Sequence, residues 1–183
     1  MNESDTLTPS DAELISRAQS GEIEAFGELY GRYLDPIYRY IRSRVDETSD
    51  AEDLCEAVFL RTFEALDRYQ ERGHPYSAYL YQVARNQLAD HYRSQEILVD
   101  LEQVAKPASR DAEPEAAIMR HEKLMDVAIS LGKLREDYQE VIRLRVILEL
   151  PTPTVAMWMD RSQGAVRVLL HRALAALRKE LDG

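Results

Sequence analysis

The stretch that decides the fold is DRSQGAVRVLLHRALAALRK, residues 160–179. Apolar side chains recur in it at three- and four-residue spacing, which predicts one face of an amphipathic helix; they are Val166, Leu169, Leu170, Ala173, Leu174 and Leu177. Ser162 is predicted to cap this helix, because its hydroxyl can accept a hydrogen bond from a backbone N–H of the first turn. Between Arg161 and Lys179 the stretch holds five basic residues and no acid, although the formal net charge of the chain is -10. Such a local reversal of charge is typical of a phosphate-binding surface. The alternative is an ordinary surface helix whose cations favour its C-terminal end.

The segments before this helix favour a helix-turn-helix module. Residues 141–148 form an apolar helical run, the segment 151–154 interrupts it with two prolines, and the short segment 155–159 follows. A helix, a break, a short helix, a turn and a basic helix is the order of elements in that DNA-binding module.

Four more helices are predicted in the N-terminal block, because apolar residues recur there with helical spacing and no segment shows the sustained alternation of a strand. The predicted helices are 11–19, 23–45, a third from about 49 to the polar loop 68–75, and 77–93. We expect Ser10 to cap the first and Pro36 to kink the second. Ser49 and Glu52 have the spacing of a capping box for the third. The sequence therefore predicts an all-α fold.

The chain is predicted to hold two small helical domains joined by a flexible linker. Residues 10–95 form the four-helix domain, and residues 114–183 form the helix-turn-helix domain, which begins with a helix from about Pro114 to Leu131. The predicted linker is 96–113, since the sequence around residues 106–114 lacks periodic apolar positions.

The charge distribution bears on how the chain meets DNA. Residues 1–30 hold seven acids and one base, whereas residues 138–183 hold five acids and seven bases. Because an acidic surface repels phosphate, we expect the full chain to bind naked DNA weakly and a partner protein to deliver it to DNA.

The sequence gives little support to other functional classes, namely enzymes, metal-binding proteins and membrane proteins. A single cysteine, Cys55, excludes an internal disulfide and a cysteine-based metal cluster, and we expect it to be a packing residue. The four histidines are scattered and no glycine-rich phosphate loop occurs, so we expect neither an enzyme nor a bound metal or cofactor. No apolar run is long enough to cross a membrane, and residues 1–11 are polar and acidic, unlike a signal peptide. We therefore expect a cytoplasmic protein without membrane insertion.

Four motifs, in order along the chain, carry a resemblance to a known family. They are AFGELYGRY at 25–33, DAEDL at 50–54, SAYLYQVARN at 77–86 with DHYR at 90–93, and GAVR at 164–167 with HRAL at 171–174. Together they resemble a bacterial extracytoplasmic-function (ECF) sigma factor of the sigma-70 family over nearly the whole chain. The resemblance implies a region 2 domain, a region 4 helix-turn-helix domain, and a promoter-recognition subunit whose partners are core RNA polymerase and promoter DNA. It leaves open whether an anti-sigma factor holds the chain inactive.

The resemblance implies that the helix starting near residue 49 docks on the coiled-coil of the largest polymerase subunit. The implied polymerase-binding residues are Asp50, Asp53, Leu54, Glu56 and Phe59. From the residues alone, acids crowded into the first turns of a helix are also explained by a solvated helix start that matches the helix dipole.

Residues 68–93 mix aromatic rings, amides and cations. That combination suits single-stranded DNA, whose bases stack on rings while its backbone follows positive charge. The resemblance implies that the loop 68–77 captures an extruded base of the start-proximal promoter element and that Asn86 reads base edges. The implied DNA-binding residues here are Arg68, His74, Tyr76, Arg85, Asn86 and Arg93. Packing is the alternative role for the tyrosines, and Tyr81 and Tyr92 fit a packed helix face.

In the C-terminal module the resemblance implies contacts with the upstream promoter element, by Arg161, Ser162, Arg167, His171 and Arg172. The family starts the first helix of this module with a serine and, three residues later, a glutamate. This chain has Pro151 and Thr154 instead, which removes a capping box. Thr152 as N-cap with Pro153 at the first helical position predicts a short helix. Asp160 is expected in the turn that follows, because aspartate tolerates left-handed backbone better than most residues.

The competing function is a stand-alone helix-turn-helix transcriptional regulator. That role needs self-sufficient DNA binding, which the acidic N-terminal block disfavours. Specific binding to duplex DNA without polymerase distinguishes the two functions.

Overall fold

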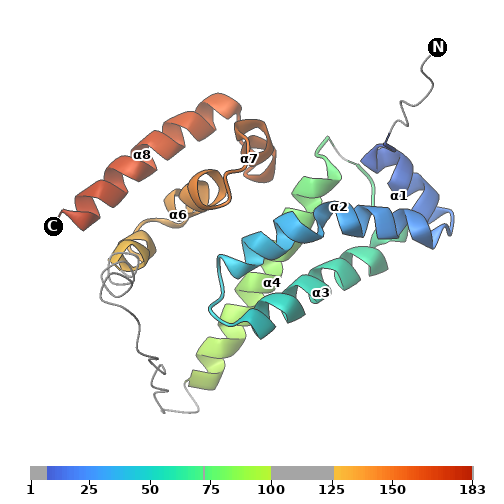
Figure 1. The fold of residues 1–183 in the computed structure, drawn as a ribbon, viewed down its shortest axis with the longest axis horizontal. Helices are drawn as coiled ribbons and strands as arrows, with labels where there is room; N and C mark the ends of the chain where they lie inside the picture. The colour runs from blue at the N-terminus through green and yellow to red at the C-terminus, as the bar shows by residue number, and fades with distance from the viewer. Residues whose placement is uncertain (1–7, 72, 100–125, 183) are drawn as a thin grey trace, which may run out of the picture. The chain divides into compact units, whose positions relative to one another are not determined.

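The computed structural model describes residues 8–71, 73–99 and 126–182, and the chain divides into two compact units, 1–93 and 94–183. Every regular element in the described ranges is helical, which confirms the predicted fold class (Figure 1). None of the described helices is long and apolar enough to cross a membrane. Within these ranges, no three histidine, cysteine, aspartate or glutamate side chains gather as ligands for a metal ion. The predicted domain limits stay predictions, and most of the predicted linker lies outside the described residues.

The N-terminal unit contains the four predicted helices. They are α1, Asp11–Gln19; α2, Ile23–Arg42; α3, Thr48–Glu64; and α4, Tyr76–Val99, with the short 3₁₀ turn η1, Leu66–Arg68, after α3. In Figure 1, α1 packs on α2, and α2 packs on α3. Pro36 lies inside α2 without ending it. α2 ends at Arg42 and not at Val45, and α4 continues beyond the predicted Arg93.

Hydrogen bonds at the helix starts confirm one predicted cap and correct another. The Ser10 hydroxyl accepts from the Glu13 backbone N–H at 3.3 Å, and the Glu13 carboxylate accepts from the Ser10 N–H at 2.8 Å. This is the capping box of α1, in which two otherwise unpaired donors are satisfied. The capping box predicted from Ser49 and Glu52 is wrong: Ser49 already lies inside α3, whose N-cap is Glu47 and makes no side-chain cap bond.

The core of the N-terminal unit is built from the inward stripe of each helix. Its fully buried side chains include Leu14, Leu29, Ile37, Tyr40, Ile41, Val58, Leu80, Tyr81 and Leu88. The rings of Tyr40 and Tyr81 pack edge to face with centroids 4.9 Å apart, which joins α2 to α4. Each large apolar side chain buried in this way contributes about 1.5–3 kcal/mol. Cys55 is buried as predicted, and burial raises the pKa of its thiol to about 11.

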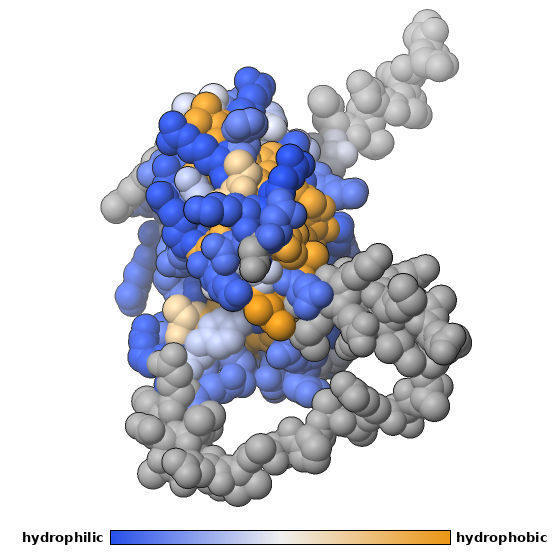
Figure 2. All heavy atoms as spheres, turned by 90° about the vertical axis from the view of Figure 1, so that its left-hand side faces the viewer, coloured by the Kyte–Doolittle hydropathy of each residue, from blue (hydrophilic) through white to orange (hydrophobic). Residues whose placement is uncertain are grey.

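Three aromatic side chains that the spacing assigns to packed faces are exposed instead: Tyr30, Phe63 and Tyr92. Tyr30 and Phe63 still make edge-to-face ring contacts, with Phe59 and Phe26, at the rim of the core. The Tyr92 hydroxyl donates to the carbonyl oxygen of Arg44, so a polar contact holds this ring at the surface. Hydrophilic side chains cover most of the face seen in Figure 2, with hydrophobic side chains gathered in patches.

The C-terminal unit contains a helix over residues 126–132, then α6, η2, α7 and α8. Their bounds are α6, Glu136–Ile142; the π-helical turn η2, Arg143–Ile147; α7, Thr152–Trp158; and α8, Gln163–Leu181. The first predicted helix of this domain is therefore described only from residue 126 onward. The apolar run 141–148 is helical up to Ile147, as predicted, but its residues 143–147 form a π-helical turn that the apolar spacing does not predict.

The helix-turn-helix has the predicted short first helix and the predicted cap on its second. Ser162 is the N-cap of α8, and its hydroxyl accepts from the Ala165 N–H at 3.1 Å. Asp160 has φ 51°, the left-handed conformation expected for it. Thr152 as N-cap is wrong: the N-cap is Pro151, which has extended backbone, and Thr152 is the first helical residue. Leu174, expected on the apolar face of α8, is exposed, and Glu149 adopts an unexpected φ of 54° before α7.

Pro151→Ser combined with Thr154→Glu places a capping box at the N-cap and third positions of α7. We expect this double variant to raise the free energy of unfolding of the C-terminal unit by about 1 kcal/mol, the usual contribution of a helix cap. The only tryptophan of the chain, Trp158, is buried in this unit, so its fluorescence during thermal melting measures the change. Pro151→Ala, which lacks a hydrogen-bond acceptor, is the control. A double variant that melts no higher than this control contradicts the start of α7 at Thr152.

Candidate protein and nucleic-acid interfaces

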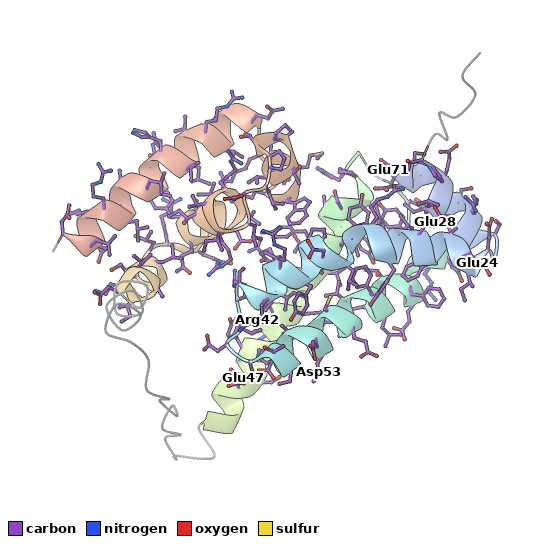
Figure 3. The ribbon with its side chains drawn as sticks, in the orientation of Figure 1. Glu24, Glu28, Arg42, Glu47, Asp53 and Glu71 are labelled. Atoms are coloured by element: carbon purple, nitrogen blue, oxygen red, sulfur yellow. The ribbon has the colours of Figure 1, made fainter. Side chains whose placement is uncertain are left out.

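The outward face of α3 carries one row of four exposed side chains, Asp53, Glu56, Leu60 and Phe63, which we call the α3 stripe. Their spacing of three and four residues places them on one side of the helix. The row begins with two carboxylates near the start of α3, where Figure 3 labels Asp53, and ends with two apolar side chains. Leu60 is 56% exposed and Phe63 is 41% exposed. A surface that is acidic at one end and apolar at the other suits a protein partner with basic and apolar groups.

The other three residues of the predicted polymerase site lie elsewhere. Leu54 is 9% exposed and Phe59 is 4% exposed, because helical spacing turns both toward the core. Both are core residues of this unit, and their part in polymerase binding stays a prediction. The carboxylate of Asp50 lies 3.6 Å from His91 Nε2, so it joins the start of α3 to α4. Leu60 and Phe63 complete the exposed row and are absent from the residues predicted above, although their spacing from Glu56 is visible in the sequence.

Tyr76 follows the loop of residues 69–75, of which residue 72 lies outside the described residues, and its ring is buried against Tyr69. Its side chain is 1% exposed, and burial raises the pKa of its hydroxyl to about 12. The ring centroids of Tyr33 and Tyr69 lie 6.0 Å and 5.4 Å from its own, and Tyr79 lies 5.0 Å from Tyr69. Direct DNA contact by Tyr76 stays a prediction, because its ring packs against Tyr33 and Tyr69 in this structure.

A groove of about 490 Å³ runs between α3 and α4, and its lining includes Arg61, Tyr79, Asn86 and Arg93. Two cations, an aromatic ring, an amide and one carboxylate, that of Asp90, thus meet in one concave surface. The Asn86 Oδ1 accepts from Gln82 Nε2 at 3.2 Å, and Arg93 donates to Asp90 at 3.0 Å. Both bonds are exposed, where a ligand can replace them at little cost in free energy.

The remaining cations predicted for this part of the chain are divided between the loop and α4. Arg68 and His74 are exposed at the two sides of the 69–75 loop, whereas Arg85 is half-buried on α4. Sequence reasoning missed Arg61, which lies on α3, far from Asn86 along the chain. Only the packing of α3 beside α4 brings it into the groove, so no local pattern could have found it.

Helix α8 presents an exposed basic face. Arg167, His171 and Arg172 are all exposed, and within the described residues neither arginine has an ion-pair partner. Val166, Leu169 and Ala173 are buried on the opposite side. Free guanidinium groups on the second helix of a helix-turn-helix can bind phosphates or the edges of guanine.

Arg161 and Ser162, the other two predicted contacts of this module, have structural partners. The Arg161 guanidinium lies 3.7 Å from the Asp137 carboxylate, which also accepts from Arg135 at 2.5 Å. The Arg135 hydrogen bond is the main cause of a lowered pKa at Asp137, and Arg161 adds to it. Ser162 caps α8. Both residues thus stabilise the turn that positions α8.

Comparison with family models assigns each of the two units to a region of the sigma-70 family. The model of Sigma-70 region 2 matches residues 29–97, and the model of Sigma-70, region 4 matches residues 130–177. The region 2 match covers the unit that carries the α3 stripe and the groove, and the region 4 match covers the helix-turn-helix. A stand-alone helix-turn-helix regulator does not account for the first match.

Similar proteins extend the likeness to nearly the whole chain. The ECF RNA polymerase sigma factor BldN of Streptomyces coelicolor is 34% identical over 92% of this chain, which spans 65% of the length of BldN. The ECF RNA polymerase sigma factor SigD of Mycobacterium tuberculosis is 30% identical over 92% of this chain and 82% of SigD. The structure of CnrH of Cupriavidus metallidurans, solved in complex with the cytosolic domain of CnrY, matches with a TM-score of 0.64 at 29% identity. It covers 95% of this chain and 98% of that one. Two region matches and a relative that is 30% identical over 92% of this chain place the chain in the ECF family of RNA polymerase sigma factors, which bind core polymerase and recognise promoters to initiate transcription.

Proposed function

We propose that three surfaces of this chain divide the work of a sigma factor. The α3 stripe binds core RNA polymerase, the groove and the 69–75 loop bind the opened strand of the start-proximal element, and α8 binds the upstream element as duplex. The observation that carries the proposal is that α8 exposes Arg167 and Arg172 without described partners in a chain of net charge -10. Such isolated positive charge is expected where phosphate is bound.

The composition of the α3 stripe supports polymerase binding. Asp53 and Glu56 can pair with basic side chains, while Leu60 and Phe63 bury apolar area against the same partner. A coiled-coil offers both groups in rows along its surface. The coiled-coil of the largest polymerase subunit, implied by the sequence resemblance, is therefore the partner that we assign to this stripe.

The groove between α3 and α4 supports binding of single-stranded DNA. Tyr79 offers a ring face, Asn86 offers a donor and an acceptor to base edges, and Arg61 and Arg93 offer charge to the backbone. Extruding a base from the duplex costs a few kcal/mol, so a protein surface that repays this only for the right base confers specificity. We assign base reading to Asn86 and backbone binding to Arg61 and Arg93, with Arg68, His74 and Arg85 as further cations around the loop.

The basic face of α8 supports duplex binding. The second helix of a helix-turn-helix lies in the major groove with its N-terminal residues on base edges. Arg167 is near that end of α8 and is assigned to a base, whereas Arg172, one turn further, is assigned to a phosphate. His171 lies between them and is assigned to the same face.

Three wider properties belong to the same proposal. The chain has no catalytic residues of its own, as expected of a specificity subunit, and it works in the cytoplasm, where core polymerase is. We propose that an anti-sigma protein is a further partner, because CnrH, which shares this fold over its length, is solved in complex with the cytosolic domain of CnrY.

Reversing the charge at the acidic end of the α3 stripe should weaken polymerase binding. In the double variant Asp53→Arg/Glu56→Arg, two carboxylates that attract basic side chains of the partner become two cations that repel them. We therefore expect the affinity for core polymerase to fall on the order of tenfold or more. Co-purification with core polymerase and a titration by fluorescence anisotropy measure the loss. Glu24→Arg/Glu28→Arg is the control, since these exposed acids lie toward the start of α2, at the other end of this unit from Asp53 (Figure 3). Core binding by the stripe variant that equals the control's contradicts the assignment.

Removing Arg172 should change the salt dependence of DNA binding. For Arg172→Ala we expect the slope of log affinity against log salt for an upstream-element duplex to shrink by about one unit, because one phosphate contact is lost. For Arg167→Ala we expect relaxed sequence preference at one base pair, with a loss of about 1–3 kcal/mol. Arg39→Ala, which removes one exposed cation of the N-terminal unit, should leave both quantities unchanged. If Arg172→Ala also leaves the salt dependence unchanged, α8 is an ordinary surface helix.

A further inference from the structure

Gln19, the last residue of α1, holds the turn η1 through two hydrogen bonds. Its side-chain Nε2 donates to the carbonyl oxygens of Leu66 and Tyr69, at 2.9 Å each. These two carbonyls stand at the two ends of η1, and the 69–75 loop begins at the second. A single 3₁₀ turn has little stability of its own. The Gln19 amide therefore fixes the point at which the loop leaves the turn.

The far end of the loop is joined to α1 by a second route. The Tyr33 hydroxyl of α2 donates to the carboxylate of Asp11, at the start of α1, and Arg32 forms an ion pair with the same carboxylate. The Tyr33 ring packs edge-on against Tyr76, the first residue of α4, where the loop ends. Thus α1 contacts one end of the loop directly and reaches the other through Tyr33.

We infer that α1 is a brace that holds the 69–75 loop in the shape that receives an extruded promoter base, and that Gln19 is its positioning residue. This inference rests on the proposed function, because it requires the loop to capture a base. Gln19 acts without touching DNA, since its amide group already donates to two backbone carbonyls.

The loop needs such a brace because, between its two ends, its described side chains bury little surface. The side chains of Gln70, Glu71 and His74 are exposed, and Gly73 reverses the chain with φ 78°. A loop that becomes ordered only when it binds loses affinity through that ordering, whereas a loop ordered during folding does not. Holding both ends of the loop in place before DNA binds therefore increases its preference for one base over the others.

Three variants separate the effect of the Gln19 hydrogen bonds from the effects of side-chain charge and side-chain shape. Gln19→Glu keeps the size of the side chain but points a carboxylate at two carbonyl oxygens. Gln19→Lys restores donors for the same carbonyls. Ser16→Glu adds the same charge one turn earlier on α1, at an exposed position, and is the matched control.

Each full-length variant is assembled with core RNA polymerase and used to select promoters from a pool randomised in the start-proximal element. Permanganate reactivity identifies the opened segment, and the ratio of best to worst base is measured at each position in it. For Gln19→Glu we expect this ratio to fall on the order of tenfold at the captured base, the size of one lost base contact. Affinity for core polymerase should stay within about twofold of wild type. Gln19→Lys and Ser16→Glu should keep the wild-type ratio.

Two results would contradict this inference, and each of them contradicts a different part of it. If the wild-type protein shows a strong preference in the opened segment and Gln19→Glu keeps it, the brace is wrong while base capture stands. If the wild-type protein shows no preference in the opened segment, base capture itself is wrong. Should Gln19→Glu fail to fold, Gln19→Met removes both donors without adding charge and is judged by the same two results.

Discussion

An amphipathic helix can bury only one stripe of its surface, and this constraint determines the surfaces that both units present. On α3, burial of Leu54 and Phe59 turns the α3 stripe outward. On α8, burial of Val166 and Leu169 leaves Arg167 on the opposite side. The burial of apolar side chains that stabilises each unit therefore also determines which charged side chains face the solvent. A substitution that rotated either helix would move the contact residues as a set.

The fold could be predicted where its causes are local. Helical spacing extends over a few turns, and the caps at Ser10 and Ser162 join a side chain to a backbone N–H three residues away. Both are visible in a short window of sequence. The start of α7 was misplaced by one residue because Pro151, which offers no capping side chain, still takes the N-cap position. The start of α3 could not be predicted from a capping signal, because its N-cap, Glu47, makes no side-chain cap bond.

The candidate site was predicted less completely because exposure depends on neighbours that are distant in sequence. The motif around Tyr76 gives no sign that the ring itself is covered by Tyr33 and Tyr69. Arg61 enters the groove only through the packing of α3 and α4. The bond from Gln19 to Leu66 joins residues 47 positions apart, beyond the reach of any periodic pattern.

We infer that this chain gives core RNA polymerase its choice of promoter, while its own acidic charge limits DNA binding without polymerase. Run-off transcription of a genomic promoter pool by core polymerase, with and without the chain, tests this most directly. The account predicts that transcripts appear only when the chain is added, and that their templates share an upstream and a start-proximal element at fixed spacing. Transcription that the chain leaves unchanged, together with specific duplex binding by the chain alone, would contradict it.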